Sequence, residues 1–201
     1  DWLYDYLKQN NPDVLTMAKD ALRDMGLKQV LDDYKDLPRN RTFKWSFGHD
    51  NWNLVCNSGA LTAAMAIADE EEEICAEVFD YGMENIQKGI LMYAPDGAWY
   101  EGTGYWHYAT NFLVDFLSAM DSTFYTSFGY KDGPGMANTG YFMSSVSSLQ
   151  GNFNFHDSGI GLISSPELFY FADNFADPGL ASVRIELMNS LGWTGAVRDI
   201  L

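Results

Sequence analysis

Apolar residues recur at helical spacing along most of the chain. Between Asn11 and Gly26, apolar side chains at positions 14, 15, 18, 21 and 22 fall on one face of a helix. Patterns of this kind predict helices over residues 11–26, 27–36, 51–68, 70–93, 103–120, 136–149, 166–176 and 178–191. Hardly any segment alternates as a strand would, so the pattern is typical of an all-α fold.

Proline, glycine and short polar residues mark where these helices begin and end. Asn11 and Pro12 are expected to start the first helix, and Gly26 is expected to end it. Asp69 is expected to cap the fourth helix, whose first turn places the acidic residues 70–73 at the positive end of the helix dipole. Turn-forming residues predict loops at 93–97, 131–135 and 152–161.

Composition adds that the chain is globular and acidic. Hydrophobic residues make up 47% of the 201, which is ample for a packed core, and the length suits one domain over residues 1–201. The 28 acidic against 12 basic residues disfavour nucleic acid and anionic membranes as partners. Apolar runs fall well short of the roughly eighteen residues that a membrane span needs. Because apolar patterns begin at Trp2 and continue to Leu201, we expect a segment truncated at both ends.

The first chemically distinctive segment is residues 96–108, with the sequence DGAWYEGTGYWHY. It places two acids, one imidazole and five aromatic side chains in a glycine-containing turn that leads into a helix. Aromatic faces stack on sugar rings, and Glu, His and Tyr carry protons near neutral pH. The segment therefore predicts a carbohydrate-processing site. The alternative is an aromatic loop that packs on its own core.

A second polar segment lies upstream, at the start of an apolar helix. Residues 48–59 have the sequence GHDNWNLVCNSG, which brings His49, Asn51, Trp52 and Asn53 to a helix entrance. Amide and imidazole groups are costly to bury without partners, so a cluster of them at this position indicates a functional site.

A short basic run precedes that segment. Arg39, Arg41, Lys44 and His49 follow one another with no acidic residue among them. Salt screens exposed charges beyond about 8 Å, so a local basic run could bind a polyanion despite the net charge of −16. A solvated loop is the alternative.

Together the two polar segments resemble the toroid domain of heparinase II/III-like polysaccharide lyases, a group that includes enzymes acting on alginate. The resemblance covers roughly residues 1–175. It implies an incomplete α/α toroid of antiparallel helical hairpins, with functional loops at helix starts. It also implies an acidic polysaccharide substrate, such as alginate or a glycosaminoglycan, and a periplasmic or secreted location. Members of the family often carry a β-rich domain after the toroid, and no such domain is expected within residues 1–201.

The family cleaves uronate chains by β-elimination, and the resemblance assigns roles on that basis. Hydrogen-bond donors must stabilise the uronate carboxylate, a role that Asn51 matches. A tyrosine serves as base and acid in the family. Tyr105, 54 positions after Asn51, agrees best with the family's separation between the Asn and the Tyr, and Tyr108 is the reserve candidate. An ordinary phenol has a pKa near 10, so nearby cations such as Arg41, Lys44 or His107 would have to favour its ionised form.

Further residues are expected to contact the sugar. His107 is a catalytic candidate that could also lie on the other side of the helix in a packing role, and Glu101 could orient Tyr105 or bind sugar hydroxyls. His156 could line the cleft or cap the helix that follows. The complete set of expected substrate-binding residues is His49, Trp52, Asn53, Trp99, Glu101, Trp106, Arg41, Lys44 and His156.

Two other functions are also compatible with these residues. A glycoside hydrolase would use Glu101 as general acid and Asp157 or Asp50 as base, with the carboxyl groups roughly 5 to 9.5 Å apart. A glycan-binding segment would stack its aromatic residues on sugar without cleaving it. Neither a metal-ligand motif nor a phosphate-binding glycine loop is found, so no cofactor is expected. Cys56 and Cys75 are expected to be buried thiols.

Overall fold

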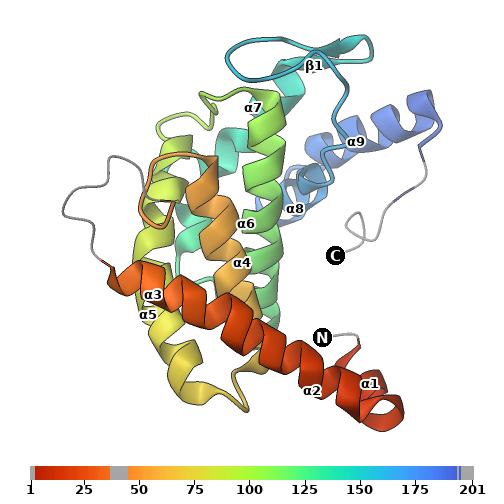
Figure 1. Cartoon of the computed structure of the whole chain (residues 1–201). Coiled ribbons are helices and arrows are strands. Elements are labelled where there is room, and N and C mark those ends of the chain that lie inside the picture. Colours follow the sequence, from red (N-terminus) through yellow and green to blue (C-terminus); the bar gives the residue numbers. More distant parts are fainter. Residues whose placement is uncertain (1–2, 37–44, 194, 196–201) are drawn as a thin grey trace.

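The computed structural model describes residues 3–36, 45–193 and 195 (Figure 1). These residues are mostly helical, which confirms the all-α prediction. The α-helices are α1 (Tyr4–Asn10), α2 (Pro12–Ala21), α3 (Lys28–Lys35), α4 (Asn51–Ile67), α5 (Glu72–Ile90), α6 (Thr103–Phe124), α7 (Thr139–Ser145), α8 (Glu167–Asn174) and α9 (Pro178–Leu191). Shorter elements are the π-helix η1 (Leu22–Leu27), the 3-10 turns η2 (Leu91–Tyr93), η3 (Tyr130–Asp132) and η4 (Met136–Asn138), and a hairpin of β1 (Ser147–Ser148) and β2 (Gly151–Asn152).

Helices α4, α5 and α6 form the centre of the molecule. They follow one another in the chain with short connections and alternate in direction. Helices α4 and α6 therefore start at the same end, and α5 runs antiparallel to both. Apolar residues such as Leu54, Ile86 and Leu113 are fully or almost fully buried where these helices meet. A Cβ atom on Gly89 would lie 2.5 Å from Asn53 Oδ1, so the close approach of α5 to α4 requires glycine there.

The first predicted boundary is wrong, because Gly26 does not end a helix. It lies inside η1, and the residues on either side of η1 keep right-handed helical backbone, so α2, η1 and α3 form one continuous helical run. The run continues because Leu27, Leu31 and Tyr34 bury their side chains against α4 and α5. Packing thus outweighs the roughly 1 kcal/mol that glycine costs inside a helix.

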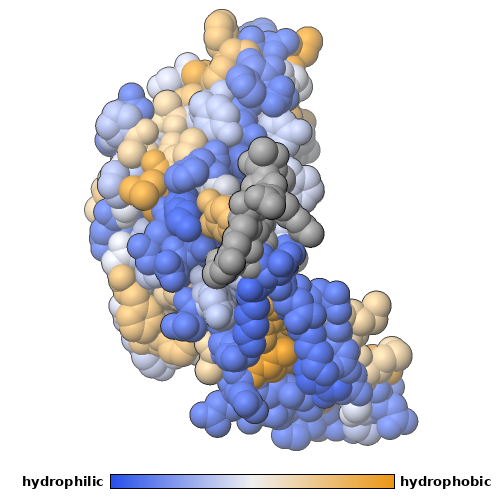
Figure 2. Space-filling model, turned by 60° about the vertical axis from the view of Figure 1, so that its left-hand side comes forward, coloured by the Kyte–Doolittle hydropathy of each residue, from blue (hydrophilic) through white to orange (hydrophobic). Residues whose placement is uncertain are grey.

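Helices α1 and α2 form an arm that extends from the rest of the chain (Figure 1). Neither helix contains a buried residue. Between the arm and helices α4 and α6 lies a groove of about 930 Å³, to which α4 contributes Thr62, Met65 and Ala66 and α6 contributes Ala119 and Thr123. Hydrophilic residues dominate the lower part of the surface in Figure 2, in keeping with the acidic composition.

Two more predicted boundaries need correction. Helix α5 begins at Glu72 after the N-cap residue Glu71, whose side chain makes no capping bond, so Asp69 does not cap it. The segment 136–149, predicted as one helix, divides into η4, α7 and β1. Its serine-rich end is poorly suited to a helix, because serine side chains compete for backbone hydrogen bonds.

The C-terminal helices α8 and α9 pack against each other and flank α7 and α6. Helix α9 has the predicted bounds, with Asp177 capping its start through Gly179 N and Gly192 ending it in the left-handed conformation. No helix among the described residues is long and apolar enough to cross a membrane. Both cysteines are free thiols; Cys75 is buried as predicted, whereas Cys56 is only partly buried.

Candidate functional site

The starts of α4 and α6 are joined by hydrogen bonds to one carboxylate. Asn51 donates to Glu101 twice, from Nδ2 to Oε1 at 2.8 Å and from its backbone N–H to Oε2 at 3.1 Å. Trp99 Nε1 donates to Oε2 at 3.1 Å. Glu101 is 7% exposed, so three donors compensate for the burial of its charge. The two polar segments found in the sequence therefore meet in space.

A third polar segment, the loop 152–161, closes over the start of α6. Ser158 Oγ lies 2.7 Å from Thr103 Oγ1 and accepts a hydrogen bond from Gly104 N at 3.1 Å. Gly102, just before the helix, has a φ of +88°, and a Cβ atom there would lie 2.5 Å from Ser158 Cβ. The loop can reach α6 only because residue 102 is glycine.

Tyr100 connects the three segments. Its hydroxyl donates to His49 O at 3.2 Å, and its ring meets the His156 ring edge-on at a centroid distance of 5.7 Å. Both histidines are exposed, and His156 Nδ1 lies 3.1 Å from Asp157 Oδ2. The expected residues His49 and His156 thus border the same surface as Tyr100. Trp52, at the start of α4, is exposed.

The surroundings of Tyr100 are acidic. Burial raises the pKa of Tyr100, and the charges of Glu101, Asp50 and Asp157 raise it further. Three carboxylates therefore act on one phenol at this site. Two of the expected cationic residues, Arg41 and Lys44, lie outside the described residues.

Tyr105 and Tyr108 are the exposed phenols of the first two turns of α6. Their exposed fractions are 36% and 39%, and they are three positions apart, so they lie on neighbouring surface. Thr123, five turns after Tyr105, lies on the same helix face and borders the groove beside α4. Tyr105 therefore leaves α6 on the side that, five turns later, borders the groove between the arm and α4.

Several expected contact residues are buried, and their assignment to substrate binding is corrected. Trp99, Trp106 and Asn53 are 0% exposed, so none of them offers a surface to a sugar. Trp106 Nε1 donates to Thr139 Oγ1 at 2.7 Å, and Trp99 packs on Tyr93. These side chains belong to the core beneath the site.

Asn51 is also buried, with 3% of its surface exposed. Its Nδ2 is bound to Glu101, whereas its Oδ1 has no hydrogen-bond partner among the described residues. An unpaired buried carbonyl oxygen costs roughly 1–3 kcal/mol. Asn51 therefore lies directly beneath the surface of the site, with unused hydrogen-bonding capacity.

His107 pairs with an acid that the sequence did not indicate. Its Nδ1 lies 2.8 Å from Oε1 of Glu167, the first residue of α8, whose side chain is 0% exposed. His107 and Tyr105 leave α6 about 200° apart, as expected for residues two positions apart on a helix. No pattern in the sequence connects residues 107 and 167, so this contact could be found only in the folded chain.

A buried amide network beneath the site also escaped prediction. Asn57 Nδ2 donates to Ser46 O at 3.0 Å, and Asn57 Oδ1 accepts from the Tyr34 hydroxyl at 2.7 Å. Asn53 Nδ2 donates to Ser46 O and to Asn85 O. Asn53 and Asn57 lie four residues apart on α4, and this spacing was the available signal. The network fixes the backbone that leads to His49.

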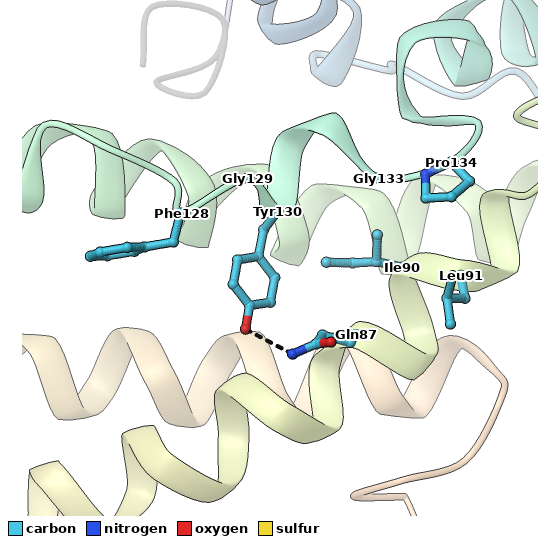
Figure 3. Close-up of a pocket in the computed structure, with 8 residues that line it drawn as sticks. All are labelled: Gln87, Ile90, Leu91, Phe128, Gly129, Tyr130, Gly133 and Pro134. Atoms are coloured by element: carbon cyan, nitrogen blue, oxygen red, sulfur yellow. Dashed lines mark hydrogen bonds between the residues drawn. The ribbon is translucent and has the colours of Figure 1, made fainter.

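A separate cavity of about 320 Å³ lies between the end of α5 and the segment that follows α6 (Figure 3). Its lining includes Gln87, Phe128 and Tyr130, and none of the expected site residues takes part. Tyr130 donates its hydroxyl to Met83 O at 2.8 Å and accepts from Gln87 Nε2 at 3.1 Å. These polar groups attach the segment after α6 to α5, which is a structural role.

Metal ligands do not gather at the site, because the described residues contain no group of three or more His, Cys, Asp or Glu side chains able to hold an ion. Comparison with protein-family models finds no match to the chain, and comparison with curated proteins finds none either. The function therefore has to be inferred from the residues themselves.

Proposed function

We propose that this chain is the helical, α/α-toroid part of a polysaccharide lyase that cleaves a uronic-acid-containing glycan by β-elimination. The observation that carries the proposal is the union of the two helix starts, where Asn51 binds Glu101 and the exposed phenol of Tyr105 projects from the next helical turn. Antiparallel α4, α5 and α6, with polar loops gathered at one end, are consistent with one part of a toroid.

In the proposed reaction Tyr105, as phenolate, removes the proton on carbon 5 of the uronate. The electron pair forms the double bond between carbons 4 and 5, and the bond from carbon 4 to the departing oxygen breaks. That oxygen takes up a proton, which the newly formed Tyr105 phenol can supply. Tyr108 is the reserve candidate for these transfers because its phenol is equally exposed.

Asn51 supplies the hydrogen bond to the substrate carboxylate in this proposal. Its Nδ2 carries a second N–H beyond the one given to Glu101. Because the side chain is 3% exposed, the substrate must displace the residues that cover it. A donor that acts on developing charge typically contributes about 10²–10³ in rate. Asn51→Ala should therefore slow turnover by about that factor, and full activity in this variant would exclude the role.

The direct assay is incubation of the chain with a panel of uronic-acid polysaccharides while ultraviolet absorbance is recorded. Elimination leaves an unsaturated ring end that absorbs, whereas hydrolysis leaves none. Growth of the absorbance with alginate or a glycosaminoglycan supports the lyase. Binding without any product would support a glycan-binding segment instead.

A second candidate, a glycoside hydrolase, is favoured by one observation. The carboxylates of Glu101, Asp50 and Asp157 all act on Tyr100, so the acids that a hydrolase needs gather in one place. Glu101, however, accepts hydrogen bonds at both oxygens, while a general acid must hold a proton on one of them. Release of reducing sugar without the ultraviolet product would nevertheless identify the hydrolase.

A further inference from the structure

The buried carboxylate of Glu167 is the strongest feature that the proposed function does not use. Its side chain is 0% exposed, and neither oxygen has a hydrogen-bond partner among the described residues apart from the close approach of His107. A buried carboxylate without compensation is strongly unfavourable, so His107 is its essential partner. The charge of Glu167 also reaches Tyr93, where burial is the main cause of a raised pKa and Glu167 adds to it.

One ring nitrogen of His107 contacts Glu167, and the other faces solvent. Nδ1 is buried against Glu167, while 32% of the side chain is exposed, so the exposed edge is the one that carries Nε2. Nδ1 and Oε1 lie 2.8 Å apart, and neither atom has a hydrogen-bond partner elsewhere among the described residues. A carboxylate at Nδ1 fixes the tautomer and leaves Nε2 for a ligand.

The position of His107 on α6 separates it from Tyr105 but not from the site. It is three residues after Gly104, which binds Ser158 of the loop 152–161, and it directly precedes the exposed Tyr108. Residues three apart on a helix share neighbouring surface, so His107 lies next to the point where the loop meets α6. Nε2 therefore faces ligand bound beside the loop, about 200° around α6 from Tyr105.

We propose that His107 is a binding residue for the sugar next to the one processed at Tyr105, and that Glu167 is its positioning residue. Through Nε2 the imidazole hydrogen-bonds a hydroxyl or carboxylate of that neighbouring sugar. This inference rests on the proposed function for the nature of the ligand. The pairing of His107 with Glu167, by contrast, is independent of any cleavage.

The first test is ¹⁵N NMR of the histidine side chains in alkaline solution, where imidazole is neutral. Wild type should show His107 with its proton on Nδ1. Glu167→Leu removes the acceptor and should move the proton to Nε2, whereas Glu167→Gln keeps an acceptor oxygen and should preserve the wild-type signature. Glu186→Gln, an exposed position on α9, is the matched control. An unchanged tautomer in Glu167→Leu overturns the positioning role. If Glu167→Leu does not fold, loss of the wild-type tautomer in Glu167→Gln overturns it instead.

The second test is calorimetric titration with tetrasaccharides of alginate and of heparan sulfate. Loss of one good hydrogen bond should raise Kd about tenfold in His107→Phe and in Glu167→Leu, with Glu186→Gln unchanged. Equal Kd values for wild type and His107→Phe would overturn the binding role. Binding that depends on His107 but is followed by no elimination would contradict the lyase and leave this inference standing. Absence of binding to wild type would contradict the glycan ligand of both proposals.

Discussion

Asn51 and Glu101 are fifty residues apart in the chain, yet two hydrogen bonds join them and hold the starts of α4 and α6 together. The carboxylate is buried and also accepts from Trp99. The same contact that could position a catalytic amide therefore also stabilises the fold. Variants at this position have to be tested for stability as well as for activity.

Glu101→Gln should destabilise the protein by about 1–3 kcal/mol. The new NH₂ group would face donors that now point at a carboxylate oxygen, and at least one buried N–H would be left unpaired. Urea unfolding measures the change. Glu84→Gln, at an exposed position on α5, is the control and should stay within about 0.5 kcal/mol of wild type. Equal stability of the two variants would show that the Glu101 hydrogen bonds contribute nothing.

Gly89→Ala should destabilise the contact between α4 and α5. The added Cβ would lie 2.5 Å from Asn53 Oδ1 and 2.7 Å from Leu54 Cδ2, so the helices would have to separate, at a cost of about 1–3 kcal/mol. Gly59→Ala meets nothing within 4 Å and should stabilise α4 by up to about 1 kcal/mol. Thermal unfolding of both variants checks the prediction. A stabilising Gly89→Ala would mean that the helices pack less closely than described.

Cys75 should react with alkylating reagents far more slowly in the folded chain than after unfolding. Burial, and after it the charge of Glu71, raises the pKa of its thiol to about 11. A raised pKa lowers the thiolate fraction at pH 8 by about a hundredfold compared with an ordinary thiol, and the rate should rise with pH up to about 11. Mass spectrometry of the labelled protein separates Cys75 from Cys56. Labelling of Cys75 at the unfolded rate would contradict its burial.

Sequence patterns identified most helices because burial follows helical periodicity. Helix α9 has the predicted bounds, since Asp177 and Gly192 are strong local signals at its two ends. Gly26 misled the prediction, because a local preference cannot reveal that Leu27 and Leu31 continue to pack on the core. Tertiary contacts decided that boundary.

The meeting of the two polar segments was predictable from the sequence, whereas the details of their contacts were less so. Asn51, Glu101 and Tyr105 come from the two segments singled out in the sequence, and the structure brings these segments together. Trp106 could have been placed in the core, because it is three and seven residues before the buried Ala109 and Leu113. The pairing of residues 107 and 167 depends on how α6 meets α8, which no local pattern encodes.

The central claim is tested most directly by the rate at which Tyr105→Phe produces the unsaturated ultraviolet-absorbing product. The substitution removes one hydroxyl from an exposed ring and should leave stability and glycan affinity almost unchanged. With Tyr108→Phe measured alongside, the account predicts that elimination falls by about 10²–10⁴ in Tyr105→Phe, as expected for loss of a general base. An unchanged rate in Tyr105→Phe would contradict it.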